Sequence, residues 1–306
     1  MSDERGRVLV TGANGNLGRA LIRRLASAGT AIRAVVRSER AAAAVRALPA
    51  APEVRIVDYG DAEALARAAE GCDAAAHLVG ILKQTRSSSY AVAHEGTARA
   101  LAAAAKRAGF RRIVYLSILG ARADSPNACL ASKARAEAIL LENPLATTVL
   151  RVPMVLGTEE PATWALRAHA GARVVPLVRG GASLEQPIDA GDVAAAIDAA
   201  LARPNLAGRV LELAGPESLP RRELVRRAAA LRGNRPLVVP LPLAAVRLFA
   251  ATAERLLADP PLTPAMLGVL EQDDAIDPAP ACRALGLALT PLDETLRRCL
   301  DRNADA

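Results

Sequence analysis

The sequence predicts an α/β protein with a doubly wound parallel sheet and a smaller, mostly helical C-terminal lobe. In the first half, short apolar runs alternate with amphipathic stretches of helical length, which is typical of a parallel sheet with helices on both faces. Three regularly spaced glycines, Gly12, Gly15 and Gly18, follow the first apolar run. With 306 residues, 52% of them hydrophobic, the chain is long enough to bury a large core.

The first turn is predicted from the residues on either side of it. Residues 7–10 have the apolar character of a buried strand, and residues 19–28 place Leu21, Ile22 and Leu25 on one face of a helix. The glycines lie between these elements, where a chain that turns tightly and approaches a phosphate has no room for a Cβ. The N-terminus of the helix would then face an anion. We therefore predict a dinucleotide site, although the glycines alone also fit an ordinary strand-turn-helix.

The rest of the first half continues the alternation. Strands are expected at residues 6–11, 31–37, 53–58, 73–79, 111–117 and 146–152, and helices at residues 16–28, 61–70, 88–108 and 129–142. Because the carboxyl ends of parallel strands meet at one edge of a sheet, the ligand is expected at that edge.

The second half has a different character. Gly and Pro are frequent from residue 153 to residue 191. Helices are then expected at residues 192–202, 221–231, 244–257 and from Pro264 onward, and residues 210–213 are a candidate for one more strand. We therefore divide the chain into a dinucleotide-binding domain at residues 1–157, with returning segments at about 184–215, and an interleaved smaller lobe for a substrate or partner at residues 158–306.

Composition argues against several classes of function. The net charge is +7, but the arginines are scattered, and aromatic residues make up only 2%, too few to stack on nucleic-acid bases. The cysteines show no Cys-x-x-Cys spacing; they are Cys72, Cys129, Cys282 and Cys299. The first residues lack the apolar core of a signal peptide. We therefore expect a cytoplasmic protein without a nucleic-acid partner, a metal site or a disulfide framework.

The residues after the second predicted strand bear on the choice of cofactor. In dinucleotide-binding folds an acidic residue here accepts the ribose 2′-hydroxyl, whereas an arginine accommodates a 2′-phosphate. The sequence has Arg37 at this point and Arg40 close behind, and a planar guanidinium can bind a phosphate with two hydrogen bonds. We therefore expect NADP(H) in preference to NAD(H). The alternative is that both arginines are solvated and balanced by Glu39.

Several motifs together resemble the extended and atypical short-chain dehydrogenases/reductases, which have the Rossmann fold of the NAD-dependent epimerases/dehydratases. The motifs include Thr11-Gly12-x-x-Gly15-x-x-Gly18, Asp58-Tyr59, His77-Leu78-Val79-Gly80, Ser132-Lys133-Ala134-x-Ala136-Glu137 and Leu150-Arg151-Val152-Pro153. Within this group the chain looks most like the branch of the NADPH-binding accessory subunit of respiratory complex I and its bacterial relatives. The resemblance implies that the cofactor is bound by Thr11, Gly12, Asn14, Gly15, Asn16, Leu17, Gly18, Arg37, Arg40, Asp58, Tyr59, Leu78, Val79 and Lys133.

The chain departs from the family at the catalytic residues. Members that transfer hydride carry Tyr-x-x-x-Lys, in which the lysine orients the nicotinamide ribose and lowers the pKa of the tyrosine. Lys133 is present here, but the tyrosine position is Cys129, a shorter side chain and a weak hydrogen-bond donor. Cys129 is either a packed side chain or a thiol whose pKa Lys133 lowers. Ser117 begins the usual serine motif, but Ile118 follows it, so Ser117 is either a catalytic partner or a polar residue that closes a strand.

Three functions therefore remain open. The first is a redox-linked, cofactor-binding protein that lacks the usual catalytic tyrosine. The second is an active oxidoreductase or epimerase with a different proton donor, and the third is an interaction protein that senses NADP(H). The resemblance implies as further partners an apolar small molecule or quinone, a protein complex, or the surface of the inner membrane. Apolar residues of the tail would serve such a partner or close the core; they are Leu241, Leu243, Val246, Leu248, Phe249, Leu256 and Leu257.

Overall fold

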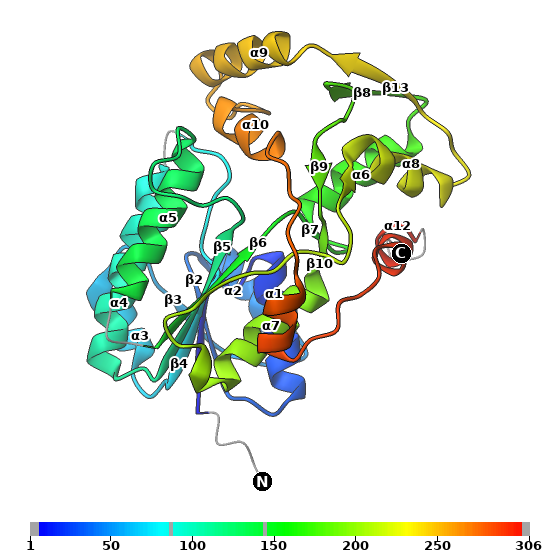
Figure 1. Ribbon diagram of the computed structural model, residues 1–306. Coiled ribbons are helices and arrows are strands. Elements are labelled where there is room, and N and C mark those ends of the chain that lie inside the picture. The colour runs from blue at the N-terminus through cyan, green and yellow to red at the C-terminus, as the bar shows by residue number, and fades with distance from the viewer. Residues whose placement is uncertain (1–5, 86–87, 143–145, 302–306) are drawn as a thin grey trace. The chain divides into compact units, whose positions relative to one another are not determined.

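The computed structural model describes residues 6–85, 88–142 and 146–301. The chain forms two compact units (Figure 1). The first unit contains Met1–Arg151, Val193–Glu212 and Ala281–Leu287, and the second contains Val152–Asp192, Leu213–Pro280 and Ala288–Ala306. Each unit is therefore assembled from segments that are far apart in the sequence.

The first unit is built on a parallel sheet, which confirms the predicted doubly wound fold. Within its described residues the sheet has seven strands in the order β11-β6-β5-β4-β1-β2-β3. The strands are β1 (Val8–Thr11), β2 (Ile32–Val36), β3 (Glu53–Ile56), β4 (Ala74–His77), β5 (Arg112–Ile118), β6 (Thr147–Val152) and β11 (Val210–Glu212). β1 lies between β2 and β4, so that Thr11 is opposite both Val35 and His77. The carboxyl ends of these three strands therefore meet.

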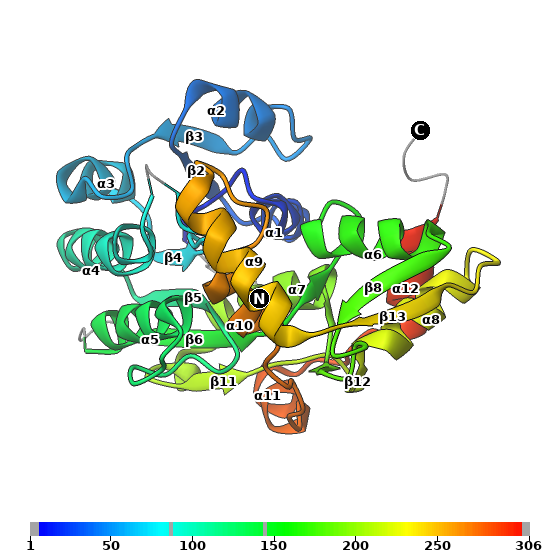
Figure 2. The ribbon, with the colours of Figure 1, turned by 90° about the horizontal axis from the view of Figure 1, so that it is seen from above.

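Helices cover both faces of this sheet (Figure 2). They are α1 (Asn16–Ser27), α2 (Glu39–Arg46), α3 (Ala62–Ala69), α4 (Thr97–Ala108), α5 (Ala128–Leu141) and most of α7 (Ala190–Ala202) and α11 (Ala279–Leu285). α3, α4 and α5 lie side by side on one face, and α1 and α7 lie on the other. The alanine-rich surfaces of α3 and α4 allow close packing over a core that includes Leu9, Leu101 and Tyr115.

Polar caps fix where several helices begin. Ser38 accepts a hydrogen bond from the N–H of Ala41 at the start of α2, and Asp61 and Asn127 cap α3 and α5 in the same way. α2 is absent from the helices expected from the sequence. The sequence features that favour α2 cover only eight residues. They are the N-cap residue Ser38 and a buried apolar stripe that includes Val45.

The helix expected at residues 88–108 has an irregular start. Ala91–Gly96 form a π-helix, η1, and α4 begins only at Thr97. The hydroxyl of Thr97 donates to the carbonyl of Ala93 at 2.8 Å. Single π-helical turns are rare and frequently occur at functional sites, and this one lies near the lysine described below.

The second unit contains more strands than expected. Its strands are β7 (Val155–Leu156), β8 (Val174–Val178), β9 (Leu184–Glu185), β10 (Ile188–Asp189), β12 (Leu219–Pro220) and β13 (Leu237–Leu241), and its helices include α6 (Pro161–Gly171), α8 (Arg221–Ala230), α9 (Leu243–Leu256), α10 (Pro264–Leu270) and α12 (Leu292–Leu300). β8 pairs with β13 in parallel, and α6, α8 and α12 share a core with Val175 and Leu177. None of the helices in the described parts of the chain has the length and apolar character needed to cross a bilayer.

Candidate functional site

The three glycines of the first turn lie in three different surroundings. Gly12 has φ +74°, in the left-handed region, and a Cβ there would lie 3.1 Å from the carbonyl carbon of Leu78 and 3.3 Å from the nitrogen of Val79. A Cβ on Gly18 would lie 2.5 Å from the carbonyl oxygen of Gly12, so Gly18 allows α1 to pack against the turn. A Cβ on Gly15 would meet only the Gly12 oxygen, at 3.2 Å. Gly15 is therefore the position with space for a ligand.

The N-terminus of α1 is suited to an anion. Gly15 is the N-cap residue and has no side chain that could cap the helix, and the first turn carries no acidic residue. The N–H groups of that turn and the positive end of the helix dipole are therefore available to a phosphate. Asn16 and Leu17, which were expected to bind the cofactor, are half-buried in this turn.

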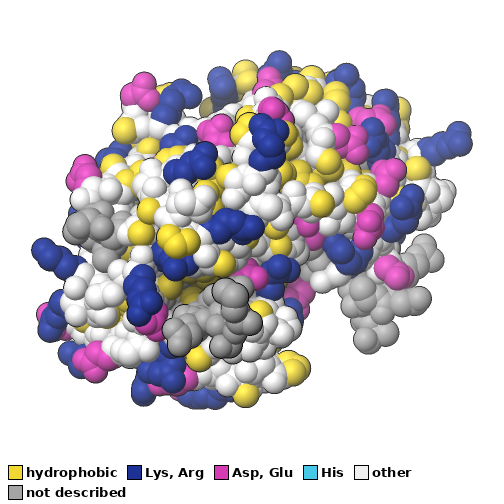
Figure 3. Space-filling model, turned by 60° about the horizontal axis from the view of Figure 1, so that its bottom comes forward, with side chains coloured by type: hydrophobic (Ala, Val, Ile, Leu, Met, Phe, Trp, Pro, Cys, Tyr) yellow, Lys and Arg dark blue, Asp and Glu magenta, His cyan; other side chains and the backbone are white. Residues whose placement is uncertain are grey.

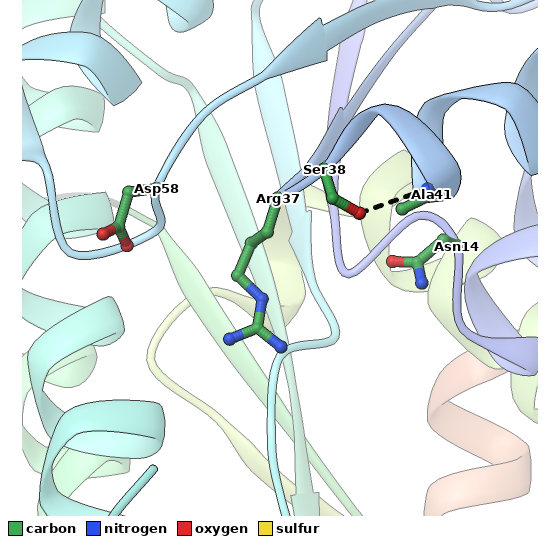
Figure 4. Close-up of a pocket in the computed structure, with 5 residues that line it drawn as sticks. All are labelled: Asn14, Arg37, Ser38, Ala41 and Asp58. Carbon is green, nitrogen blue, oxygen red and sulfur yellow. Dashed lines mark hydrogen bonds between the residues drawn. The ribbon is translucent and has the colours of Figure 1, made fainter. Parts of the chain in front are cut away.

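A pocket of about 440 Å³ lies beside the turn, at the end of β2 (Figure 4). It is lined by Asn14, Arg37, Ser38, Ala41 and Asp58. Arg37 extends into the space between Asp58 and Asn14, and Ser38 caps α2 at its side. The structure thus brings together three of the predicted cofactor residues. Arg40, which was also predicted, is exposed and does not line this pocket.

Tyr59 connects the pocket to the glycine turn. The N–H of Gly12 donates to the Tyr59 hydroxyl at 2.9 Å, and that hydroxyl donates to the carbonyl of Val35 at 2.9 Å. The guanidinium carbon of Arg37 lies 5.7 Å from the centroid of the Tyr59 ring. The Tyr59 side chain is buried, and burial raises the pKa of its phenol, which therefore stays protonated and able to donate.

Lys133 occupies a second polar site in the same unit. It lies on α5, and its ammonium donates to the carbonyl of Leu116 at 3.0 Å and lies 4.7 Å from the centroid of the Tyr115 ring. A Cβ on Gly80 would lie 2.9 Å from the Lys133 nitrogen, so glycine at that position makes room for the ammonium. Burial lowers the pKa of Lys133 to about 8.

Cys129 is packed one turn before Lys133. Its thiol is fully buried and lies 3.7 Å from the carbonyl oxygen of Ile81. Burial raises the pKa of Cys129 to about 11, although Lys133 acts in the opposite direction. The structure therefore favours the packed side chain over a thiol activated by a lowered pKa.

Ser117, the third candidate catalytic residue, belongs to a buried polar network. It is buried at the end of β5 and donates to Glu137 at 2.5 Å, and Glu137 in turn pairs with Arg151 at 2.6 Å. These contacts explain Ser117 as a polar residue that joins β5 to α5.

Two residues beside Cys129 were not singled out as site residues from the sequence. His94, on the π-helix, has its Nε2 atom 3.1 Å from both the nitrogen and the oxygen of Ile81, and its ring stacks on Tyr90 at 5.6 Å. Burial lowers the pKa of His94 to about 3, so its ring is neutral. His94, Tyr90 and Cys129 together hold the segment that follows β4; the Tyr90 hydroxyl donates to Leu82 at 2.8 Å. The sequence gives no sign of this arrangement, because it depends on the π-helix that carries His94.

His77 is a satisfied core histidine. Its Nδ1 atom lies 2.6 Å from the Thr11 hydroxyl, and its Nε2 atom lies 3.2 Å from the Thr97 hydroxyl. Burial lowers the pKa of His77 to about 3. In the described part of the chain, no three His, Cys, Asp or Glu side chains are grouped as ligands for a metal.

Comparisons with known proteins show the family of the chain. The family model described as NAD(P)H-binding matches residues 12–204. The chain is 30% identical over 249 residues to NADH dehydrogenase [ubiquinone] 1 alpha subcomplex subunit 9, mitochondrial, of Arabidopsis thaliana, a match that covers 79% of the chain and 62% of the plant protein. It is 31% identical over 243 residues to the ceramide reductase of Caulobacter vibrioides, and this match covers 79% of the chain and 75% of the reductase.

Solved structures share the fold. A nucleoside-diphosphate-sugar epimerase from Pseudomonas aeruginosa superposes with a TM-score of 0.75 at 23% identity, covering 98% of this chain and 97% of the epimerase. MoeE5 in complex with UDP-glucose and NAD gives a TM-score of 0.76 at 20% identity, covering 98% of this chain and 100% of MoeE5. At this level of identity the likeness concerns the fold alone.

Proposed function

The chain belongs to the NAD(P)H-binding family of short-chain dehydrogenases/reductases, and we propose that it holds NADP(H) as a redox-linked cofactor-binding protein that lacks the usual catalytic tyrosine. One observation carries the proposal. The residue at the tyrosine position, Cys129, is fully buried and its thiol is directed at the Ile81 carbonyl. A buried thiol with a raised pKa is poorly suited to exchange a proton with a substrate oxygen.

The residues that would hold the cofactor are those of the glycine turn, the pocket and Lys133. The N-terminus of α1 would receive the pyrophosphate, Asp58 the adenosine, and Arg37 a 2′-phosphate. The Lys133 ammonium has three N–H donors, and one of them donates a hydrogen bond to Leu116. The other donors would bind the nicotinamide ribose. When bound, the cofactor supplies hydride chemistry; the chain supplies binding and orientation.

The preference for NADP(H) is tested by calorimetric titration of both cofactors. The wild type is expected to bind NADP(H) more tightly, and Arg37→Ala is expected to remove most of the difference, because a charge-assisted contact to phosphate is lost. Arg40→Ala is the matched control, since Arg40 is exposed nearby but does not line the pocket. Equal affinity of the wild type for the two cofactors would contradict the proposal.

The relative named ceramide reductase favours a second candidate, a reductase that acts on an apolar carbonyl compound with a different proton donor. The relative named as a subunit of NADH dehydrogenase favours association with a larger assembly, at the inner membrane or elsewhere. Turnover of NADPH with long-chain ketones separates the reductase from the binding protein. Elution of the protein as part of a large assembly, without turnover, would support the subunit role.

A further inference from the structure

We propose that Tyr59 is a positioning residue that ties the glycine turn to recognition of the 2′-phosphate: its hydroxyl holds the turn, and its ring orients Arg37. The inference rests on the proposed binding of NADP(H). It assigns Tyr59 a role beyond direct contact with the cofactor. The two halves of the role can be separated, because the hydroxyl and the ring contact different groups.

The hydroxyl ties together the ends of the strands that form the site. Tyr59 follows β3, accepts from the N–H of Gly12 at 2.9 Å and donates to the carbonyl of Val35 on β2 at 2.9 Å. Gly12 is the residue with φ +74°, and its conformation directs the chain toward Gly15 and the start of α1. Without the phenol, the N–H of Gly12 would lose its partner inside the fold, and the turn would be less ordered before the pyrophosphate binds.

The ring acts on Arg37. The Arg37 side chain is exposed and long, so that a free guanidinium would adopt many rotamers and lose them on binding a phosphate. At 5.7 Å from the centroid of the buried Tyr59 ring, the guanidinium lies within the range of a cation–π contact. Figure 4 shows the Arg37 side chain extended into the pocket. The ring therefore pre-orients the cation for a ligand that carries a phosphate there.

Two substitutions separate the halves of the role. Tyr59→Phe removes the hydroxyl and keeps the ring, whereas Tyr59→Leu removes both. We expect Tyr59→Phe to weaken NAD(H) and NADP(H) by the same factor, about tenfold for one lost buried hydrogen bond. We expect Tyr59→Leu to show this loss and, in addition, to reduce the preference for NADP(H) by about twofold to fivefold, the size of an exposed cation–π contact. Calorimetry of both cofactors measures both effects.

Hydrogen exchange of the Gly12 amide provides a readout without cofactor. In the apo protein the exchange should be faster in both variants than in the wild type, because the hydrogen bond to the phenol is lost. Unchanged exchange together with unchanged affinities in Tyr59→Phe would overturn the role of the hydroxyl. An equal preference for NADP(H) in the two variants would overturn the role of the ring.

Arg37→Lys tests the ring without altering the core. Lysine keeps the charge but lacks the planar guanidinium that stacks on a ring. The preference for NADP(H) should fall by at least as much as in Tyr59→Leu, because lysine also loses the second hydrogen bond to the phosphate. In the Arg37→Lys background Tyr59→Phe and Tyr59→Leu should differ less in preference than they do beside Arg37, because an ammonium stacks less well on a ring. An undiminished preference in Arg37→Lys would contradict the proposal. Lack of any preference in the wild type would instead refute the proposed function, while the exchange of Gly12 would still test the hydroxyl.

Discussion

The side chain of Lys133 is a buried cation, and its burial opposes the stability of the fold. The ammonium is buried with the Leu116 carbonyl and the Tyr115 ring as its neighbours, and burial lowers its pKa from 10.5 to about 8. A buried cation without a paired carboxylate is costly. Under the proposed function, the same ammonium would contact the cofactor.

Lys133→Met should therefore raise the thermal stability of the apo protein at pH 7 while weakening cofactor binding. The folded pKa of about 8 is below the unfolded value of 10.5, so the folded state binds fewer protons. Stability from this group is present above pH 10.5 and is lost as the pH falls to about 8. The advantage of the variant should thus be largest at pH 8 and below and shrink toward pH 10. Melting curves at several pH values measure it.

Lys106→Met is the matched control, because Lys106 is exposed on α4. It should leave both the melting temperature and the cofactor affinity close to those of the wild type. If Lys133→Met lowered the melting temperature at pH 7, the contacts of the ammonium would outweigh its burial.

The glycines give a second prediction at the same scale. Gly15→Val should abolish the thermal stabilisation by NADP(H) and leave the apo melting temperature within about 4 °C of the wild type, since a Cβ there meets only the Gly12 oxygen. Gly18→Ala should instead destabilise the apo protein by more than about 2 kcal/mol, because its Cβ would lie 2.5 Å from that same oxygen. Retained stabilisation by NADP(H) in Gly15→Val would place the site elsewhere.

At the scale of elements, the sequence predicted the strands of the first unit because most of them are short apolar runs, β3 with its Glu53 and Arg55 being the exception. It did not predict α2, which has only eight residues, mostly alanine and arginine, so that its buried stripe consists of Ala42 and Val45 alone. β8 and β13 were also missed, since Pro176 and Pro240 within them argue against strands. Both prolines occur in a two-stranded ribbon, where each strand has a free edge that needs no N–H donor.

In the site, too, the sequence predicted the residues with local signals and missed the contacts between distant segments. Arg37, Asn14 and Asp58 were found from their places after strands and glycines, and they line one pocket. The hydrogen bonds of Tyr59 and the position of His94 on a π-helix depend on contacts between distant segments. No spacing in the sequence encodes them.

The exposed apolar residues of α9 predict binding to an external partner. Leu248, Phe249 and Leu256 on this helix are 70%, 56% and 74% exposed. Exposed large apolar side chains of this kind are typical of a docking surface. Leu248→Ser with Phe249→Ser should reduce flotation of the protein with anionic vesicles several-fold, because an amphipathic helix binds a bilayer through its apolar face. Trp164→Ser on α6, a residue of similar exposure, is the control. No flotation of the wild type would contradict a bilayer as the partner of this face.

At the scale of the whole molecule, charge does not indicate a nucleic-acid partner. The chain has a net charge of +7, yet Figure 3 shows the Lys and Arg side chains of one face spread among acidic ones. Many arginines are paired, for example Arg33 with Glu53 and Arg151 with Glu137. On this face the positive charge is therefore mixed with negative charge and does not form a continuous basic stripe.

Turnover is also a property of the whole molecule, since it needs cofactor, proton donor and substrate together. We expect the purified protein to show little turnover with carbonyls, alcohols and nucleotide sugars, because a positioned acid or base contributes about 10² to 10⁴ in rate. Initial rates of NADPH oxidation measure this. An ordinary enzymatic rate that Cys129→Ala does not slow would reveal a different proton donor and end the binding-protein proposal.

Restoring the tyrosine should not restore activity. Cys129 has no exposed surface, and its thiol lies against the Ile81 carbonyl in the segment that His94 and Tyr90 hold. A phenol in Cys129→Tyr would have to displace this segment, and overpacking of this kind costs about 1 to 3 kcal/mol. We therefore expect Cys129→Tyr to have a lower melting temperature than Cys129→Ser and no gain in NADPH oxidation. If Cys129→Tyr were instead as stable as the wild type and active, the segment after β4 would yield readily, and the loss of the tyrosine would be the single step separating this chain from its catalytic relatives.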